Sequence, residues 1–336
     1  MNSDPIFSSG SLCVVGNINR DVKTAPVRAG EHLFTDGETS VSSIIETIGG
    51  GGANSAFAAA SLGARVAFLG KVGPDGLGKR LEQTLTRHGI SAHLAKDSER
   101  PTGTSLALSF HNGHRHFISC LPSSESLSLA DLDLSALTGH RHLLRADVWF
   151  SEAMLFEGNK TLLETARRSN ITVSLDLNWD PQWGRAAAET IRARKQAVRD
   201  VLPFVNLAHG NVRELMEFTD APNLETALKA LSGWGVEAVV VHMGAKGAGY
   251  WHEGALVVEP PAPVTSQVNT TGTGDVLSVC MMLLHHREEL AVTERLRRAN
   301  TLVADFIEGK RAFIPALADE PSSFKKSQDS KRAFDG

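Results

Sequence analysis

Short apolar runs alternate with longer amphipathic segments along most of the chain. Runs of four or five mostly apolar residues, bounded by glycine and polar turn residues, are typical of buried strands. The segments between them repeat their apolar positions at helical spacing. This alternation predicts βαβ units, and therefore a doubly wound α/β fold with a mostly parallel sheet flanked by helices. The predicted strands are 12–15, 65–69, 146–150, 171–175, 204–207 and 238–241, a hairpin is predicted within 249–258, and the predicted helices are 53–62, one that ends at Gly89, 158–169, 185–200, 211–218, 223–232, 274–286 and 293–308.

A different pattern, strand-like alternation without a helical period, marks two further stretches of the chain. In the second of them, the turn pair Asn112-Gly113 separates two runs rich in strand-forming residues, which is a strong hairpin signal. We therefore expect a small β-sheet lid, drawn from about 18–48 and 100–120, beside the carboxyl ends of the parallel strands.

Composition narrows the class of protein. The 336 residues are 42% hydrophobic and 21% charged, with a net charge of −4, so the chain lacks the clustered basic excess of proteins that bind nucleic acids or membrane surfaces. The longest apolar stretch, 276–284, is too short to cross a bilayer, and no signal-peptide pattern opens the chain. The three cysteines lie too far apart in sequence to indicate a disulfide framework or a zinc site. We expect a cytoplasmic protein with a single domain over 10–318 and a disordered polar tail over 319–336.

Two glycine motifs resemble nucleotide-binding loops but lack the required chemistry. Residues 73–80, GPDGLGKR, have P-loop spacing, yet Arg80 stands where a serine or threonine must hold Mg²⁺, and Asp75 would place a carboxylate near phosphate. Residues 244–249, GAKGAG, fit the pattern GxGxxG, but a strand follows them instead of a helix. A P-loop enzyme and a dinucleotide oxidoreductase are therefore disfavoured.

A third glycine motif, NTTGTGD at 269–275, directly precedes an apolar helix. Its small residues let backbone N–H groups point at one spot, and the positive end of the helix dipole adds to that field, so the motif favours an anion site. Asp275 would be useful there if it removed a proton from a hydroxyl that attacks phosphorus. A simple helix cap is the alternative role for Asp275, and the motif alone leaves both open.

Six short segments, in their order along the chain, together resemble the signatures of the ribokinase-like (phosphofructokinase-B-type) carbohydrate kinases. The resemblance covers roughly residues 12–315. The segments are GGGGAN at 49–54, LGA at 62–64, GKVGPDGLG at 70–78, DLN at 176–178, NVRE at 211–214 and TTGTGD at 270–275.

The resemblance implies an ATP-dependent phosphotransferase that acts on a hydroxyl of a sugar or nucleoside, with Mg²⁺ and a β lid over the substrate. By the same resemblance, Asp275 is the general base, and the backbone of Gly272, Thr273 and Gly274 forms the anion hole. Lid closure would exclude water, which otherwise competes with the sugar hydroxyl.

Several residues are implied to face the nucleotide. Asn211 and Glu214 would organise Mg²⁺ through water, with an exposed helix start as the alternative role for the pair. His242 stands where a threonine commonly meets the nucleotide, although a histidine that ends a buried strand is more often a packed residue. Asn269 replaces the aspartate that helps to hold potassium in many members, which argues against a monovalent cation. The nucleotide-binding set is Asn211, Glu214, His242, Gly244, Gly247 and Thr271.

On the substrate side, short polar side chains and exposed backbone match the donors and acceptors of a polyol. Residues 16–21 resemble the GSxNxD segment of ribokinase, which favours a neutral, ribose- or ketose-like sugar. Asp180 falls where sugar-acid kinases of the family tend to carry arginine, which also disfavours an acidic substrate. The residues implied to bind substrate are Asn19, Asp21, Gly50, Gly51, Asn54 and Glu152.

Two other functions remain open at this point. One is a nucleoside kinase on the same scaffold, and the other is a catalytically silent relative that senses a sugar. The presence of Asp275 with Gly272 and Gly274 counts against silence, because a pure binder needs no acid facing an anion hole. The unpaired edges of the lid strands also favour a homodimer through the lid.

Overall fold

The computed structural model describes residues 5–111, 114–267 and 271–317. The predictions made for the Asn112-Gly113 turn, for Asn269 and for the tail at 319–336 fall outside these residues.

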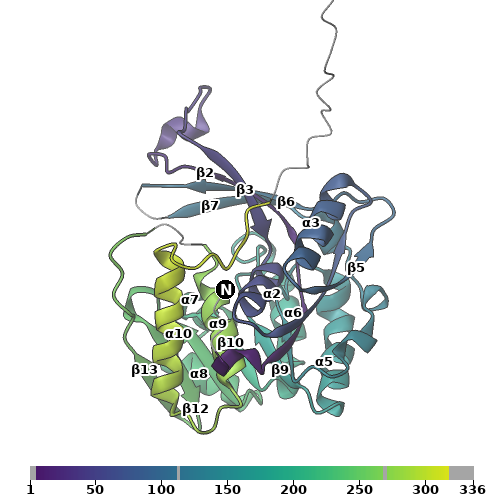
Figure 1. The fold of residues 1–336 in the computed structure, drawn as a ribbon, viewed down its shortest axis with the longest axis vertical. Coiled ribbons are helices and arrows are strands. Elements are labelled where there is room, and N and C mark those ends of the chain that lie inside the picture. Colours follow the sequence, from purple (N-terminus) through teal and green to yellow (C-terminus); the bar gives the residue numbers. More distant parts are fainter. Residues whose placement is uncertain (1–4, 112–113, 268–270, 318–336) are drawn as a thin grey trace, which may run out of the picture.

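A large sheet forms the centre of the fold (Figure 1). Its neighbouring strands are parallel, except that β12 (Ala248–His252) runs antiparallel to both of its neighbours. The prediction of a mostly parallel sheet is therefore confirmed. Within the described residues, the strands follow the order β13 (Ala255–Glu259), β12, β11 (Ala238–His242), β10 (Leu207–Asn211), β9 (Thr172–Asp176), β8 (His142–Arg145), β1 (Ser11–Val15), β4 (Arg65–Val72) and β5 (Ser91–Lys96).

Helices cover both faces of this sheet, because alternate residues of each buried strand point to opposite faces. In β1, Leu12 and Val14 pack into one core, whereas Cys13 and Val15 pack into the other. The first core is covered by α1 (Pro5–Ser8), α2 (Gly51–Ser61), α3 (Gly76–Arg87), α9 (Thr273–Leu284) and α10 (Val292–Ile307), and the second by α5 (Asn159–Arg168), α6 (Ala188–Arg199), α7 (Val212–Thr219) and α8 (Leu224–Gly233).

A smaller sheet, which we call the lid sheet, lies above one end of the central sheet (Figure 1). It comes from the two stretches that the alternation pattern singled out. Its middle pair, β2 (Asn19–Thr24) and β6 (Thr104–Ser109), is parallel and its outer pairs are antiparallel. A short helix, α4 (Pro122–Glu125), follows the last lid strand. The strand order is β3 (Ile44–Gly49), β2 (Asn19–Thr24), β6 (Thr104–Ser109) and β7 (Arg115–Cys120).

Two predicted strands were placed wrongly. The strand predicted at 146–150 is β8, which ends at Arg145, and Asp147 then takes a φ of 54°, a left-handed conformation that ends the extended chain. The polar side chain of Arg145 is buried, so polarity concealed the true strand. The strand predicted at 204–207 is β10, which begins at Leu207 after a short 3₁₀ turn.

The edge strand β5 was not predicted. Its side chains are mostly half-buried, so its apolar positions do not alternate clearly.

The segment with P-loop spacing, residues 73–80, forms the start of a helix. Asp75 caps α3 by accepting a hydrogen bond from the backbone N–H of Gly78 at 2.8 Å. Helix α2 begins at Gly51, two residues before the predicted start.

Candidate active site

A cavity of about 820 Å³, here called the central cavity, lies between the lid sheet and the carboxyl ends of the central strands. Most of the predicted site residues line it, although they come from distant parts of the sequence. Gly244 and Gly247 line a second cavity instead, and Glu152 lines a third. The predicted residues that line the central cavity are Asn19, Asp21, Gly50, Gly51, Asn54, Asn211, Glu214, His242, Thr271, Gly272, Thr273, Gly274 and Asp275.

Asp275 lies in the first turn of α9. Gly272 holds the cap position of this helix with a φ of 89°, so Asp275 is not the N-terminal cap. The Nδ2 of Asn54 donates a hydrogen bond to Oδ2 of Asp275 at 2.9 Å. Burial raises the pKa of Asp275 to about 8, the Asn54 hydrogen bond opposes the rise, and the carboxylates of Asp147 and Glu214 add to it. A base with a pKa near neutrality is suited to take a proton at physiological pH.

Two buried carboxylates, Asp147 and Asp176, also line the central cavity. Asp147 accepts hydrogen bonds from the backbone N–H groups of Asn17 at 2.8 Å, Gly51 at 3.1 Å and Gly52 at 2.8 Å, so it joins the end of β1 to the start of α2. The sequence did not assign Asp147 to the site, because the predicted strand at 146–150 included this residue, whereas β8 ends at Arg145. Carboxylate oxygens accept hydrogen bonds, which suits the hydroxyl groups of a sugar.

The lid sheet contributes polar and charged side chains to the same space. Asn19 donates from Nδ2 to Oδ1 of Asp21 at 2.8 Å, and the Lys23 ammonium lies 3.8 Å from Oδ2 of Asp21. Arg115, which sequence reasoning also missed, donates from its guanidinium to the hydroxyl of Thr271, beside the anion-hole motif. The lid sheet therefore contacts the N-terminal region of α9 directly.

Asn211 and Glu214 form a reciprocal cap at the start of α7. The backbone N–H of Asn211 donates to Glu214 Oε2 at 2.7 Å, and the backbone N–H of Glu214 donates to Asn211 Oδ1 at 2.9 Å. Amide and carboxylate oxygens are the ligands that Mg²⁺ prefers, so the pair fits the ion chemically. Over the described residues, no three His, Cys, Asp or Glu side chains are arranged to hold a metal ion.

The second cavity has a volume of about 320 Å³ and opens on the other side of the α9 N-terminus. Its walls include the apolar side chains of Leu277, Val303 and Ile307, which suit a flat heterocycle. His242 lines both cavities, and its Nε2 lies 2.9 Å from the hydroxyl of Ser278. Burial lowers the pKa of His242 to about 4, so its ring is neutral at pH 7 and supplies no cation for phosphate.

The third cavity, of about 510 Å³, adjoins the central cavity and holds Glu152 and Asp180. Asp180 is fully buried and pairs with Arg194, whose Nε lies 2.7 Å from Oδ2 of Asp180. The Nη1 of Arg194 also lies 3.7 Å from Oε1 of Glu152. Because Arg194 balances the charge of Asp180, this residue gives no argument against an acidic substrate, contrary to the expectation from its position in the sequence. Glu152 stays a predicted substrate contact.

Comparison with known proteins gives matches over most of the chain. Residues 9–302 match a family described as pfkB family carbohydrate kinase. A fructokinase from Vibrio alginolyticus is 25% identical over 72% of this chain and 77% of its own length. A 2-dehydro-3-deoxygalactonokinase from Haloferax volcanii is 28% identical over 67% of this chain and 71% of its own length.

Solved structures share the fold. A ribokinase from Arabidopsis thaliana, complexed with ribose and ATP, superposes with a TM-score of 0.69 at 21% identity, over 92% of this chain and 96% of the ribokinase. In the part of the chain that the structure describes, no helix combines the length and apolar character needed to span a membrane.

Proposed function

The chain belongs to the pfkB family of carbohydrate kinases, and from this premise we propose that it transfers the γ-phosphoryl group of ATP to a hydroxyl of a neutral, ribose- or ketose-like sugar. One observation carries the proposal. The central and second cavities meet at the N-terminus of α9, where Asn211, His242, Thr273 and Gly274 line both. A sugar hydroxyl in the central cavity and a terminal phosphate from the second cavity would meet beside Asp275.

In the proposed reaction, Asp275 accepts the proton of the sugar hydroxyl as its oxygen attacks the γ-phosphorus. The new O–P bond forms while the bond from the γ-phosphorus to the bridging oxygen breaks, and ADP leaves. The backbone N–H groups at 272–274 stabilise the charge on the transferred group. Mg²⁺, bound through water near Asn211 and Glu214, would supply further neutralisation of phosphate charge.

The carboxylates around the central cavity support a polyol as the acceptor. Asp21, Asp147 and Asp176 offer hydrogen-bonding groups to the hydroxyls of a sugar. Arg115 and Arg185 line the same cavity, so its lining is not uniformly acidic. The names of relatives include both a fructokinase and a 2-dehydro-3-deoxygalactonokinase, so the choice between neutral and acidic sugars needs a direct test.

That test is ADP release with Mg-ATP over a panel of pentoses, ketohexoses, 2-dehydro-3-deoxy sugar acids and nucleosides. We expect turnover on a pentose or ketohexose, with kcat/KM above that for any acidic sugar. Higher kcat/KM on a sugar acid would contradict the neutral-sugar assignment but not the phosphoryl transfer. If a sugar binds but no compound in the panel causes ADP release, the proposed phosphotransferase activity is contradicted.

A nucleoside acceptor is the second candidate, and the third cavity favours it. This cavity shares Ser119, Leu121, Phe150 and Pro181 with the central cavity, so the space beside the sugar position continues into it. The apolar members of this set suit a flat base. Turnover confined to nucleosides in the same panel would select this candidate.

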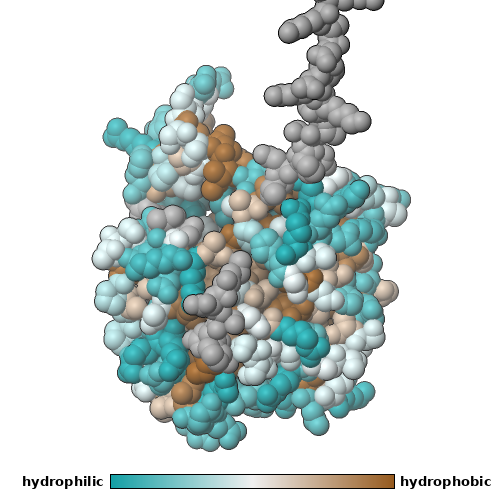
Figure 2. Space-filling view, in the orientation of Figure 1, coloured by the Kyte–Doolittle hydropathy of each residue, from teal (hydrophilic) through white to brown (hydrophobic). Residues whose placement is uncertain are grey.

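We also propose that two chains associate through their lid sheets. Ile44 and Ile118 are 62% and 57% exposed, and Ile118 continues a cross-strand row with Leu106 and Val22. Figure 2 shows apolar surface gathered on this small sheet. Such exposed apolar surface on the lid sheet favours association, whereas the β3 edge is already paired in part with residues 315–317.

Light scattering after gel filtration is expected to give twice the 36.1 kDa of one chain. Ile118→Glu should give a monomer, because it places a charge in the contact. Val258→Glu, a matched change at an exposed strand position of the central sheet, should leave the dimer intact. A monomeric wild-type protein would contradict the proposal.

A further inference from the structure

Lys71 lies near the end of β4. It lines neither the central cavity, which contains Asp275, nor the second cavity. Its side chain is only 12% exposed. The ammonium lies 3.1 Å from Oδ2 of Asp131 and 3.6 Å from Oδ2 of Asp97, and it donates to the backbone carbonyl of Ser126 at 3.3 Å. Largely burying one ammonium and two carboxylates costs desolvation energy. We therefore expect this cluster to have a structural role.

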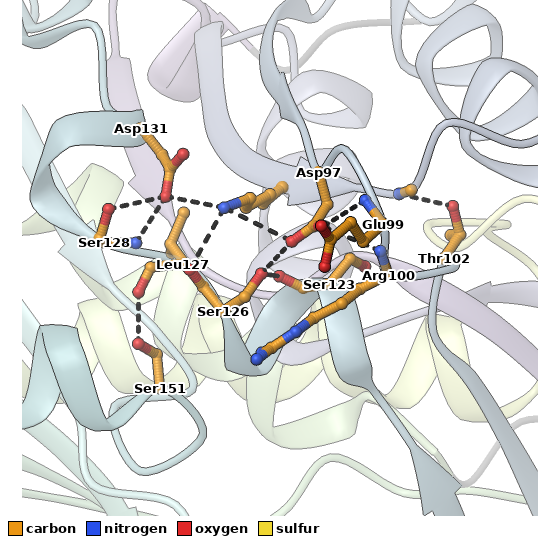
Figure 3. A network of polar contacts seen from close by, with 12 residues as sticks. Asp97, Glu99, Arg100, Thr102, Ser123, Ser126, Leu127, Ser128, Asp131 and Ser151 are labelled. Atoms are coloured by element: carbon orange, nitrogen blue, oxygen red, sulfur yellow. Dashed lines mark hydrogen bonds and ion pairs between the residues drawn. The ribbon is translucent and has the colours of Figure 1, made fainter.

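The partners of Lys71 belong to two separate connections of the lid sheet. Asp97 lies in the segment that leads into β6, whereas Ser126 and Asp131 lie in the segment that follows β7. These connections are also joined directly, because the hydroxyl of Ser126 donates to Oδ2 of Asp97 at 2.5 Å. The Lys71 ammonium contacts both Asp97 and Asp131. Figure 3 shows these two carboxylates with Ser126 between their connections. One side chain of the central sheet thus ties together both ends of the β6–β7 hairpin.

Further hydrogen bonds stiffen each connection. Asp97 accepts from the backbone N–H groups of Glu99 at 3.0 Å and Arg100 at 2.8 Å, so the turn before β6 has a fixed shape. Two residues later, the Thr102 hydroxyl donates to Oδ1 of Asp75 at 2.7 Å and accepts from the Gly73 N–H at 2.9 Å. These contacts fasten the entry of β6 to the start of α3.

The exit from β7 is fastened in a comparable way. Asp131 accepts from the backbone N–H and the hydroxyl of Ser128, both at 2.8 Å. The hydroxyl of Ser151, in the loop after β8, donates to the backbone carbonyl of Leu127 (Figure 3). The segment after β7 is therefore held both by Lys71 and by a loop next to the central cavity.

The hairpin that these contacts anchor forms one wall of the central cavity. Ser105 on β6 and Phe117 and Ser119 on β7 line the cavity, and Leu121 follows directly. Without Lys71, the carboxylates of Asp97 and Asp131 would face each other with no cation between them, and like charges would push the two connections apart. The cavity wall would then lose its fixed position relative to Asp275.

We propose that Lys71 is a positioning residue for phosphoryl transfer: it locks both roots of the β6–β7 hairpin to the central sheet, so that the lid sheet closes over the sugar in one register and excludes water. The proposal rests on the proposed sugar-kinase function. The mechanical part, a hairpin fastened by Lys71, is measurable without catalysis. Lys71 touches no reacting atom and acts through the position of the lid sheet.

Lys71→Met is expected to lower kcat/KM for the sugar roughly 10- to 100-fold, the scale of a misplaced substrate contact. The KM for ATP should change little, because the second cavity is remote from the cluster. The coupling ratio, which is the amount of sugar phosphate formed per ADP released, should fall. The reason is that a loosened lid admits water to the phosphoryl group, so some ATP is hydrolysed without phosphorylating the sugar. Amide hydrogen exchange should speed up in β6 and β7 but not in β10 or β11. Lys71→Arg should restore coupling and exchange protection, because it keeps a cation in place.

The matched control is Lys96→Met. Lys96 also lies at a strand end, one residue before Asp97, but its ammonium pairs with Glu82 of α3 at 2.6 Å and is 45% exposed. This control should match wild type in coupling ratio and exchange. If Lys71→Met does not fold, Asp131→Asn serves as the second variant, because it leaves Lys71 paired with Asp97. It should show smaller changes in the same quantities, namely kcat/KM for the sugar, the coupling ratio and the amide exchange of β6 and β7.

Separate outcomes test the sugar-kinase function and the anchoring role of Lys71. If the wild type phosphorylates no sugar, the proposed function fails, while faster exchange of β6 and β7 in Lys71→Met would still support the anchor. If the wild type is active and Lys71→Met only melts at a lower temperature, with the sugar KM, coupling ratio and exchange of the hairpin equal to those of Lys96→Met, the proposal is overturned.

Discussion

Asp275→Asn is expected to lower kcat on the preferred sugar by roughly a thousandfold, the scale of losing a general base in phosphoryl transfer. Asparagine is close to aspartate in shape and can keep the hydrogen bond with Asn54, so the cavity should hold its form. It cannot accept the proton of the sugar hydroxyl. The KM for ATP should stay near the wild-type value, and Asp200→Asn, at the end of α6, should be fully active.

The pH dependence provides a second signature of the same residue. Because the base must be ionised, kcat/KM of the wild type should rise about tenfold per pH unit up to the pKa of Asp275, about 8, and level off above it. A flat profile between pH 6 and 8, or an Asp275→Asn variant with more than a tenth of the wild-type kcat, would contradict the assignment of Asp275 as the base.

The same pKa makes Asp275 costly for stability. The folded protein holds the proton more tightly than the unfolded chain does, so this residue stabilises the fold at low pH, and that contribution is lost as the pH rises toward about 8. Asp275→Asn carries no such charge. Its melting temperature should therefore exceed that of the wild type at pH 8, and the difference should shrink toward pH 4.

Gly50→Ala is expected to destabilise the protein by about 3 kcal/mol or more and to abolish tight sugar binding. Gly50 has a φ of 96°, where an L side chain is strained, and a Cβ there would lie 2.3 Å from the backbone oxygen of Asn17. Backbone cannot move aside as a flexible side chain does. The strain would displace the start of α2, and with it Asn54 and the cavity wall.

Gly233→Ala is the matched control. A Cβ at Gly233, the last residue of α8, meets no atom within 4 Å. This change should leave stability within about 1 kcal/mol of wild type, because alanine favours helix. Urea unfolding of both variants, followed by sugar kinetics, measures the difference. Equal midpoints for Gly50→Ala and wild type would show that the close approach to Asn17 is not obligatory.

Much of the fold could be predicted because strand and helix periods are written locally in the sequence. The buried strands β1, β4, β9 and β11 carry buried apolar residues in their interiors, with polar residues mostly at their ends. The family resemblance, which is confirmed, rests on short contiguous motifs. β8 was misplaced because His142 and Arg145 are buried polar residues, and burial of a polar residue depends on partners far away in sequence.

The site was predictable to the extent that it lies in motifs. Asp275 and the residues at 272–274 could be named from one glycine motif. Asp147 could not, because its role depends on three backbone N–H groups from the end of β1 and the start of α2. The Lys71 cluster was hidden for the same reason, since its partners Asp97 and Asp131 come together only through the fold. The charge balance of Asp180 by Arg194 likewise needed the structure.

The most direct test of sugar phosphorylation by Asp275 is ³¹P NMR of wild type and Asp275→Asn in identical mixtures of ATP, Mg²⁺ and the preferred sugar. We expect the wild type to form ADP and a sugar phosphomonoester in equal amounts, and Asp275→Asn to leave ATP intact over the same period. Release of inorganic phosphate in place of the phosphomonoester, or equal product from both proteins, would contradict this expectation.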